Sequence, residues 1–567
     1  MYRYIRRGLT GILAGALSGL ALALAARSYA FGLIFGVIVG GLYSVTMRQV
    51  RRGYAENLMT AATFGLPLWG FINVIAAPLL AGRMPDWSAI GIREHFPTLV
   101  GWVLFCASLG VLNQLLTDLA SVAWGEEQST VSIATPPVKR RIVILGGGFA
   151  GMTTARYLEK QLEKDLSVEI SLVSESNALL FTPMLAEVAG SSLEPSHIST
   201  PLRNSLRRTD FLRARVTGVD LSNRRVYLEE IISATPVSES RDLAYDLLVL
   251  ALGSVSNYFG MSNVEERAFN FKTLLDAIRI RNHVIEMFER ADRDPDRARR
   301  APLLSFVIAG GGFAGVELAG ALNDFARGIL ADYPNLNPDE VRIVLVHSRD
   351  RILPELSESL GSYAQQKMEA RGIEFRLGRH VTDARPGVVV LDDSEIPAET
   401  LVWTAGTTPS PIVQFLNAEK DRRGGVKVDR HLAVTGCAGV WALGDCAAAA
   451  DAKSGKSCPP TAQFALRQAK IVANNVAASL RGNRPKAFHF DSLGALCVIG
   501  YQTACAELTI PFARSRVLQF SGLLAWIMWR GIYLAKLPGL ERKIRVLFDW
   551  TIELFFPRDI VQTIDLK

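Results

Sequence analysis

The hydrophobic residues of this chain follow two different patterns. Before about residue 125 they form four long apolar stretches, and after residue 139 they form short runs between polar and glycine-rich turns. Each long stretch is close to the ~20 residues that a helix needs to cross a bilayer. A cleaved signal peptide would account for the first stretch only. The pattern therefore predicts an all-α region of four transmembrane helices at residues 8–26, 29–47, 58–81 and 97–124.

The soluble part contains one pattern twice. A short apolar strand runs into Gly-x-Gly-x-x-Gly and then into an apolar helix, at RRIVILGGGFAGM and at LLSFVIAGGGFAGVE. The first glycine permits a sharp turn, the second lets the backbone touch a pyrophosphate, and the third lets the helix pack on the strand. The pattern predicts an α/β fold with two Rossmann-like dinucleotide-binding domains. The turn residues are Gly146, Gly148, Phe149, Ala150 and Gly151 in the first copy, and Gly310, Gly312, Phe313, Ala314 and Gly315 in the second.

The order of these patterns predicts the domain organisation. A polar segment with a Pro-Pro pair is a linker, the first dinucleotide domain is interrupted by the second, and a C-terminal region follows. The boundaries are 1–125 for the membrane region, 126–138 for the linker, 139–262 and 396–487 for the first domain, 263–395 for the second, and 488–567 for the C-terminal region. The residue pattern of that last region predicts two short amphipathic helices with aromatic and cationic residues. Such helices suit either membrane contact or packing on the domain.

Composition and charge support a membrane protein. Of 567 residues, 49% are hydrophobic, and the net charge is +7. The mean hydropathy is +0.20, which is high for a wholly soluble chain. No nucleic-acid motif is found, so we expect no nucleic-acid partner. Cationic residues flank the apolar stretches mainly on one side, at Arg3, Arg6, Arg7, Arg48, Arg51, Arg52 and residues 139–141, against Arg27, Arg83 and Arg93 on the other. The positive-inside rule then predicts a multi-pass protein with its catalytic domains on the cytoplasmic face.

The residue types limit the chemistry of the chain. The membrane region has one histidine, His95, in a predicted loop, which does not suit a haem held between helices. Asp118 is either part of a proton or ion path or a carboxylate near the interface. The chain has six cysteines and no Cys-x-x-Cys, so neither a disulfide framework nor a metal site is expected.

Several residues of the first domain are candidates for flavin contacts. Glu175 ends the second strand, where an acid holds adenosine ribose hydroxyls, although it could be a solvated carboxylate. Ala251 and Gly253 follow another strand and permit close backbone approach. Asp445 ends a strand, where it could accept a hydrogen bond from the flavin ribityl chain. Ala462 and Gln463 begin an alanine-rich helix whose first turn would point toward the flavin.

Two features of the second domain bear on its nucleotide. Glu317 lies in the first helical turn, where it either complements the helix dipole or faces the nicotinamide and flavin. A strand ends in His347-Ser348-Arg349, and an NAD-selective site would place an acid at position 347. These residues favour NADPH or weak discrimination between NADH and NADPH, unless Arg349 is an ordinary surface residue.

Residues 139–567 resemble the type II (non-pumping) NADH:quinone oxidoreductases. The resemblance is carried by GGGFAGM with Glu175, LLFTPML, EVAGSSLEP, LVLALG, GGGFAGVELAG, VWTAGTTPSP, WALGDCA, PPTAQFALRQA and GLLAWIMWRGIYL, in order. It implies a membrane-bound enzyme that uses FAD and NADH or NADPH to reduce a membrane quinone, with the lipid bilayer and a homodimer as further partners.

The resemblance also assigns roles to individual residues. Glu317 and Gln463 become the catalytic candidates, with Gln463, Arg467 and Gln468 at the quinone and Ala465 in the same motif. Thr182, Val216, Ala405 and Gly406 join the cofactor contacts. Three features depart from the family pattern: Arg467 replaces a glutamine, His347 replaces an acid, and the N-terminal bundle is extra.

Other functions remain to be weighed. A pyridine-nucleotide disulfide reductase needs a cysteine pair near the flavin, and residues 152–436 contain no cysteine. A sulfide:quinone-type oxidoreductase also needs redox cysteines, and a ferredoxin-type reductase would not explain the apolar stretches. A membrane-tethered flavin redox sensor is compatible with both glycine turns.

Overall fold

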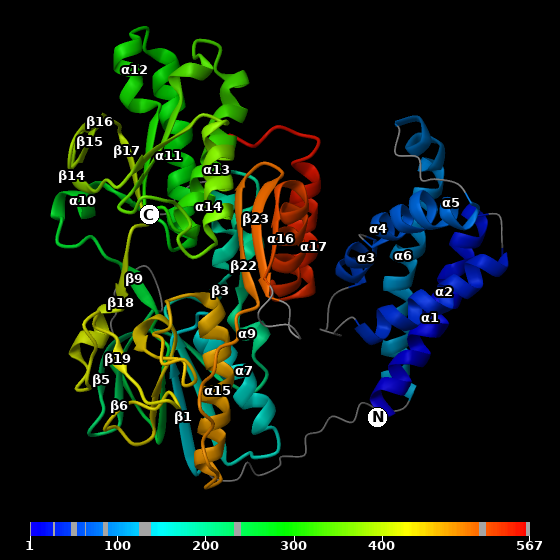
Figure 1. Cartoon of the computed structure of the whole chain (residues 1–567). Helices are drawn as coiled ribbons and strands as arrows, with labels where there is room; N and C mark the ends of the chain where they lie inside the picture. The colour runs from blue at the N-terminus through cyan, green and yellow to red at the C-terminus, as the bar shows by residue number, and fades with distance from the viewer. Residues whose placement is uncertain are drawn as a thin grey trace. The chain divides into compact units, whose positions relative to one another are not determined.

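The structure is a computed structural model that describes residues 2–26, 29–46, 54–62, 64–82, 89–123, 138–231, 240–509 and 517–562. The chain divides into two compact units, Met1–Ala134 and Thr135–Lys567 (Figure 1). Arg3, Arg27 and His95 were singled out in the sequence, and their side chains fall outside the described part.

The first unit is helical in its described residues. Its elements are α1 (Tyr2–Ala26), α2 (Tyr29–Thr46), α3 (Tyr54–Ala62), α4 (Gly65–Trp69), the π-helical η1 (Gly70–Ala76), α5 (Ala77–Leu80) and α6 (Ala89–Ala123). Within the described residues one helical segment, Thr98–Leu119, has the length and apolarity to cross a membrane, and Leu9–Leu20, Gly32–Ser44 and Gly70–Leu79 are shorter apolar segments. The stretch predicted at 58–81 is divided between α3, α4, η1 and α5. Pro67 lies in this stretch and lacks the N–H that a continuous helix uses.

Glycines bring α1 and α2 into close backbone contact. A Cβ atom at Gly15 would lie 2.0 Å from the carbonyl oxygen of Gly36, and one at Gly40 would lie 2.2 Å from that of Gly11. No larger residue fits at these positions without moving a helix. Small residues that let helices approach this closely are typical of helix pairs in membranes.

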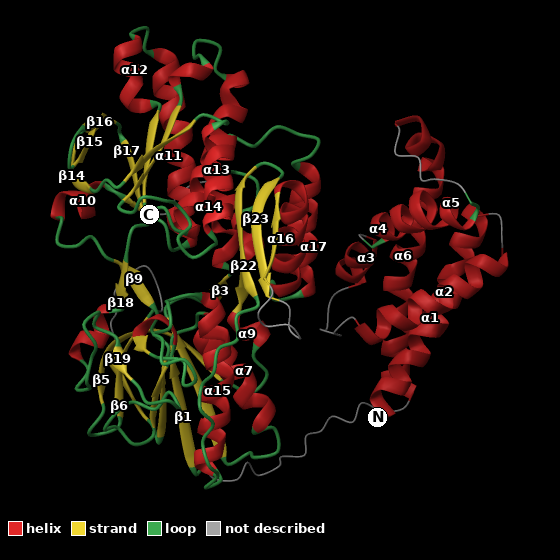
Figure 2. Cartoon of the chain, in the orientation of Figure 1, coloured by secondary structure: helices red, strands yellow, loops and turns green. Residues whose placement is uncertain are grey.

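The first sheet of the second unit has the strand order β20-β8-β1-β2-β5-β6-β7. Strands β1, β2, β5, β8 and β20 run parallel, and β6 and β7 complete the sheet antiparallel. The bounds are β1 (Arg140–Leu145), β2 (Val168–Ser174), β5 (Asp210–Asp220), β6 (Arg225–Glu230), β7 (Ser240–Ala244), β8 (Leu247–Leu250) and β20 (Val440–Ala442). Helices α7 (Phe149–Gln161) and α15 (Ala462–Leu480) pack together beside β1 (Figure 2). A hairpin of β3 (Ala178–Leu180) and β4 (Ser199–Pro201), with the short helix α8 (Leu185–Ala189), follows β2.

The second sheet has the order β10-β17-β11-β12-β13, and its described pairs are parallel. Its elements are β10 (Phe269–Asn270), α11 (Leu274–Arg293), α12 (Arg297–Leu303), β11 (Ser305–Ala309), α13 (Phe313–Gly328), β12 (Arg342–His347), α14 (Glu358–Glu369), β13 (Ile373–Leu377) and β17 (Thr400–Trp403). Between β13 and β17 the antiparallel strands β14 (Val381–Arg385), β15 (Val388–Leu391) and β16 (Glu395–Pro397) form a meander. Because β17 returns to pair with β11, the second domain extends past residue 395, where the sequence pattern placed its end.

Two further sheets position the site. The strands β9 (Ser254–Ser256) and β18 (Thr407–Pro409) pair antiparallel and form the two-stranded connection between the dinucleotide domains (Figure 1). The C-terminal region forms a three-stranded sheet of β22 (Gly494–Gly500), β23 (Thr503–Thr509) and β24 (Val517–Ser521), followed by α16 (Gly522–Lys536) and α17 (Leu540–Ile552). The sequence pattern predicted the two helices but not this sheet. Gly320 of α13 touches the backbone of Ile499 in β22, so the C-terminal sheet packs directly on the second domain.

Candidate active site

The first glycine turn has the geometry that its sequence predicts. Gly146 has φ +109°, and a Cβ atom there would lie 2.1 Å from the carbonyl oxygen of Ala251. A Cβ at Gly151 would lie 1.9 Å from the carbonyl oxygen of Gly146, so only glycine lets α7 approach β1 this closely. Gly148 caps α7 and faces open space, with nothing within 4 Å of its Cβ position. The turn is therefore closely packed at Gly146 and Gly151 and open at Gly148, as a pyrophosphate-binding turn requires.

The second glycine turn repeats this arrangement. Gly310 has φ +120°, and a Cβ there would lie 2.5 Å from Oγ1 of Thr404. A Cβ at Gly315 would lie 1.9 Å from the carbonyl oxygen of Gly310, whereas the Cβ position of Gly312 meets only Glu355, at 4.0 Å. In both domains the first glycine of the turn packs on the residue that follows a neighbouring parallel strand. Gly146 packs on Ala251 after β8, and Gly310 packs on Thr404 after β17. The chain offers two equivalent anion cradles at helix N-termini.

Asp445 lies at the junction between the two dinucleotide domains. Its Oδ2 accepts a hydrogen bond from the Ser254 hydroxyl at 2.7 Å, and the Lys272 ammonium donates to the same hydroxyl at 2.7 Å. Burial lowers the pKa of Lys272, and the negative charge of Asp445 opposes that shift. Lys272 and Ser254 were not identified as site candidates from the sequence. A single lysine before a helix and a single serine after a glycine form no recognisable motif.

The loop that carries Asp445 is held by α15. The side chain of Gln468 is buried, and its Oε1 accepts a hydrogen bond from the Gly444 N–H at 2.7 Å. Because this oxygen is engaged with the backbone, we reassign Gln468 from quinone contact to support of the Asp445 turn. Gly444 also packs against Ala150 and Ala465, since a Cβ atom at Gly444 would lie 3.3 and 3.7 Å from their Cβ atoms. The first turn of α7, the Asp445 turn and α15 therefore meet at one place.

The N-terminal turn of α15 faces the C-terminal region. Nε2 of Gln463 donates a hydrogen bond to the carbonyl oxygen of Gly494 at 3.1 Å, where β22 begins. The guanidinium of Arg467 lies over the ring of Phe490, 4.6 Å from its centroid, and burial lowers its pKa. Burial lowers the pKa of Lys536, at the end of α16, and the charge of Arg467 lowers it further. Arg467, which replaces the family's glutamine, is thus part of a cationic group beside α16.

The remaining candidates lie at the ends of strands or the starts of helices. Glu175 follows β2 and is exposed, with an ion pair to Arg215 at 3.3 Å. The other predicted contacts are placed as follows: Thr182 follows β3, Val216 lies in β5, Ala251 and Gly253 follow β8, Ala405 and Gly406 link β17 to β18, Phe313 and Ala314 begin α13, and Ala462 begins α15.

His347 is the last residue of β12, and its ring packs against Gly311 in the second glycine turn. Nδ1 accepts a hydrogen bond from the Gly311 N–H at 3.1 Å. Burial lowers the pKa of His347, and the charge of Arg349 lowers it further. An imidazole that accepts a backbone N–H is neutral, so this position brings no negative charge to the adenosine end of the second site. Ser348 and Arg349 are exposed beside it.

Glu317 lies deep between α13 and the C-terminal region. Its Oε1 accepts a hydrogen bond from the Val498 N–H of β22 at 3.3 Å. Burial raises the pKa of Glu317 to about 8, and the carboxyl of Glu187 raises it further. Glu317 therefore carries a proton at neutral pH. The helix-dipole explanation of this residue does not hold, because the first turn of α13 contains no acidic residue. Glu317 instead packs against β22.

A row of aromatic side chains connects the first glycine turn with the C-terminal helices. Phe149, the first residue of α7, packs edge-on against Phe181 with centroids 5.9 Å apart, and Phe181 against Tyr533 at 6.2 Å. Tyr533 in turn packs on Trp529 at 4.8 Å. Burial raises the pKa of Tyr533 strongly, with Glu317 adding to the effect. These rings form an apolar wall beside the Glu317 carboxyl.

The cysteines do not provide a thiolate near the glycine turns. Burial raises the pKa of Cys446 to about 11 and that of Cys505 to about 12, so both thiols stay protonated at neutral pH. Cys497 and Cys505 face each other across β22 and β23 as free thiols. A reactive thiolate needs the opposite environment, with nearby positive charge and a lowered pKa.

Comparisons with known proteins agree with this geometry. Residues 140–469 match the family of pyridine nucleotide-disulphide oxidoreductases, and residues 493–559 match the NDH2 C-terminal domain. The chain is similar to a type II NADH:quinone oxidoreductase of Mycobacterium tuberculosis, with 31% identity over 75% of this chain and 90% of that protein. It is also similar to a probable NADH dehydrogenase of Dictyostelium discoideum, with 34% identity over 74% and 90%.

Solved structures share the fold. The NDH2 of Plasmodium falciparum in complex with RYL-552 has a TM-score of 0.67 at 19% identity, covering 75% of this chain and all of that one. The sulfide:quinone oxidoreductase of Aquifex aeolicus has a TM-score of 0.56 at 18% identity, covering 74% and 95%.

Proposed function

The chain belongs to the type II NADH:quinone oxidoreductases, and from this premise we propose how its residues divide the reaction. As a member of this family it is an FAD enzyme that oxidises NAD(P)H and reduces a quinone without pumping protons. The observation that carries the finer proposal is the position of Glu317. This buried carboxyl lies on the nucleotide-binding helix α13 and is held by the C-terminal strand β22.

The first cradle suits FAD. Gly148 leaves room for the pyrophosphate at the N-terminus of α7, Glu175 is exposed at the end of β2 for ribose hydroxyls, and Asp445 is oriented by Ser254 and Lys272. When bound, FAD supplies the chemistry that accepts a hydride from the nicotinamide and passes two electrons to the quinone. The protein positions the groups and excludes water.

The second cradle suits the nicotinamide dinucleotide, and we propose that it accepts both NADH and NADPH. A carboxylate at the end of β12 would repel a 2′-phosphate, and this chain has a neutral His347 there with Arg349 beside it. A guanidinium matches phosphate geometry well. The ratio of NADH to NADPH oxidation with a quinone acceptor is the direct measurement.

We propose that the quinone enters between α15 and the C-terminal helices. Gln463 and the aromatic wall of Tyr533 and Trp529 line this approach, and the exposed outer face of α16 includes Leu523, Leu524 and Ile527. Together with the exposed Phe555, this face offers apolar surface to lipid. A quinone dissolved in the bilayer could then reach the Glu317 carboxyl without crossing water.

For the first unit we propose a four-helix membrane anchor that leaves the second unit on the cytoplasmic face. The close glycine contacts between α1 and α2 and the apolar length of α6 support it, as does the distribution of arginines. Deleting residues 1–125 is expected to leave a protein that binds FAD and oxidises NADH. Loss of the flavin on that deletion would mean that the bundle belongs to the active site instead.

The decisive experiment on the enzyme itself uses purified full-length protein. NADH is expected to bleach the flavin absorbance, and menadione is expected to restore it over many turnovers. If NADH bleaches the flavin but menadione never restores it, the chain is a redox sensor rather than a quinone reductase.

A further inference from the structure

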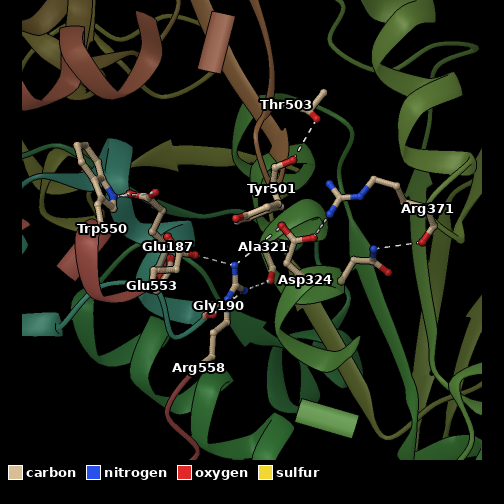
Figure 3. A network of polar contacts seen from close by, with 12 residues as sticks. Glu187, Gly190, Ala321, Asp324, Arg371, Tyr501, Thr503, Trp550, Glu553 and Arg558 are labelled. Atoms are coloured by element: carbon tan, nitrogen blue, oxygen red, sulfur yellow. Dashed lines mark hydrogen bonds and ion pairs between the residues drawn. The ribbon is translucent and has the colours of Figure 1, made fainter. Parts of the chain in front are cut away.

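Four carboxyl groups line one cavity between α13, α8 and the C-terminal segment. Glu317 and Asp324 lie two turns apart on the same face of α13, Glu187 comes from α8, and Glu553 follows α17. The same cavity is lined by Arg530 and Arg558. Figure 3 shows Glu187, Glu553, Asp324 and Arg558 grouped around it. Four acids in one interior space require either cations or protons to balance them.

Two of these acids are balanced by arginines. Glu553 accepts from Nη2 of Arg530 at 2.8 Å and from Nη2 of Arg558 at 3.0 Å. Asp324 is bound by Arg371 and lies 4.0 Å from Nη2 of Arg558. Three guanidinium groups thus face two carboxylates, and Arg558 also donates to the carbonyl oxygens of Gly190 and Ala321. This half of the cavity is a fixed ion network (Figure 3).

The other two acids have neutral partners in the described contacts. Glu187 accepts the indole N–H of Trp550 at 3.2 Å, and Glu317 accepts the Val498 N–H. Burial raises the pKa of Glu187 to about 8, in spite of the nearby Arg530 and Arg558 and with a further rise from Glu553. The pKa of Glu317 is raised to about 8 in the same way, and Glu187 contributes to it. Both carboxyls carry a proton at neutral pH, and they affect each other electrostatically.

The cavity adjoins a hollow at the protein surface. Asp324, Tyr501, Glu553 and Arg558 line both, and the hollow is completed by side chains such as Arg327, Arg371 and Phe556. Tyr501 and Phe556 are 45% and 65% exposed, so the hollow reaches solvent. Three of the four shared residues, Asp324, Glu553 and Arg558, belong to the ion network. Charged and polar side chains therefore connect the surface hollow with the cavity that Glu187 lines.

The reaction of this family has a use for such a path. A nicotinamide gives up a hydride, whereas a quinol carries two hydrogens, so each turnover takes one proton from solution. We propose that this proton enters through the surface hollow, passes the Asp324–Arg558 network and is relayed by Glu187 to Glu317. Glu317 gives its proton toward the reacting groups and regains one from Glu187, which is reprotonated from the hollow. Both carboxyls end each turnover as they began. The relay rests on the proposed place of Glu317 at the junction of nucleotide and flavin.

Glu187→Gln tests the relay in full-length holoenzyme. Glutamine keeps the oxygen that accepts from Trp550 but cannot pass on a proton. We expect menadione turnover with NADH to fall at least about tenfold above pH 7, while NADH bleaches the flavin at the wild-type rate, since hydride transfer takes up no proton. Glu541→Gln, at an exposed glutamate of α17 paired with Arg545, is the matched control and should change neither rate.

Two further measurements separate a relay from a structural role. Infrared spectra of the resting enzyme at neutral pH should lose the band of a protonated carboxyl in Glu187→Gln, and Glu187→Asp should restore part of the turnover. Equal slowing of flavin bleaching and quinone turnover would overturn the relay, as would an unchanged pH profile. If Glu187→Gln fails to retain flavin, the pH profile of Glu187→Asp decides. Failure of the wild-type enzyme to reduce menadione would instead overturn the function proposed for the whole site.

Discussion

Nδ1 of His347 accepts a hydrogen bond from the backbone N–H of Gly311, at 3.1 Å. The ring lies so close that a Cβ atom at Gly311 would be 2.6 Å from it. The residue that ends β12 therefore supports the second glycine turn from behind instead of presenting a charge to the nucleotide ribose. Selectivity at this site then depends on the exposed residues that follow, of which Arg349 is the one with a positive charge.

Arg349→Ala should reduce the use of NADPH more than that of NADH. An exposed contact between arginine and phosphate is worth on the order of 1 kcal/mol, so kcat/KM for NADPH should fall about fivefold relative to NADH. Steady-state kinetics with menadione measures both values. Arg299→Ala, an exposed arginine of α12, is the control. An unchanged ratio would show that Arg349 is an ordinary surface residue.

His347→Asp should shift selectivity in the opposite direction. A carboxylate at the end of β12 binds the 2′-hydroxyl of NADH and repels the 2′-phosphate of NADPH. The substitution also removes the acceptor for the Gly311 N–H, so KM for both nucleotides is expected to rise somewhat. Improved discrimination in favour of NADH supports the proposal, and equal losses for both nucleotides contradict it.

Substituting valine for Gly148 or for Gly312 should impair the binding of one cofactor at a time. A Cβ at Gly148 or Gly312 meets no close protein atom, so the added side chain points into the cradle and the fold is retained. Gly148→Val should yield a folded protein without bound FAD, measured by the flavin absorbance. Gly312→Val should keep the flavin but raise KM for NADH by tenfold or more, on the order of 1.4 kcal/mol.

The crowded glycines provide the contrast. Gly151→Ala places a methyl group within 1.9 Å of the Gly146 carbonyl oxygen, so α7 must move away from β1. This variant should lose thermal stability as well as flavin. If Gly148→Val and Gly151→Ala have the same effects, the open cradle is not the reason for the glycine at position 148.

Both glycine turns could be predicted from the sequence because each turn needs glycine for a local reason, a positive φ or a contact with a nearby backbone. The sequence pattern placed Glu317 in the first turn of its helix, whereas α13 begins at Phe313 and its first turn contains no acidic residue. The burial of Glu317 depends on β22, which lies about 180 residues later in the chain. Lys272 had no local pattern, and Glu187 begins the EVAGSSLEP motif, in which nothing indicated a role for that residue. Their partners, Ser254 and Trp550, become neighbours only through tertiary packing.

Gln468 illustrates a different limit. The family motif places it near the quinone, on the same helix as Gln463 but five residues later, which turns it to a different face. Only the fold shows that this side chain points toward the Gly444 N–H while Gln463 points toward Gly494. The C-terminal sheet was also missed. Its edge strand β24, VLQFS, is exposed at four of five positions and shows no buried face, although β22, GALCVIG, is an apolar run.

Removing Glu553 should destabilise the second unit strongly. Its carboxylate is 8% exposed and pairs with both Arg530 and Arg558. Glu553→Gln therefore leaves the buried Arg530 guanidinium without its anion and leaves Arg558 with only the more distant Asp324 carboxylate. Breaking a buried ion network in this way costs about 3 kcal/mol. Thermal unfolding of the holoenzyme measures the loss. Glu541→Gln breaks only an exposed pair and should cost less than about 0.5 kcal/mol, so similar losses in the two variants would contradict the role of the network.

The two raised carboxyl pKa values make stability depend on pH. Glu187 and Glu317 titrate near 4.5 when the chain is unfolded and near 8 when it is folded. Between these pH values the folded state therefore binds more protons than the unfolded state. The stability that the two groups contribute is fully present below about pH 4.5 and is lost as the pH rises through about 8. The double variant Glu187→Gln, Glu317→Gln cannot lose these protons. Its melting temperature should change less between pH 6 and pH 9 than that of the wild-type protein, which should fall over this range. Parallel curves for the two proteins would mean that neither carboxyl is held in its neutral form by burial.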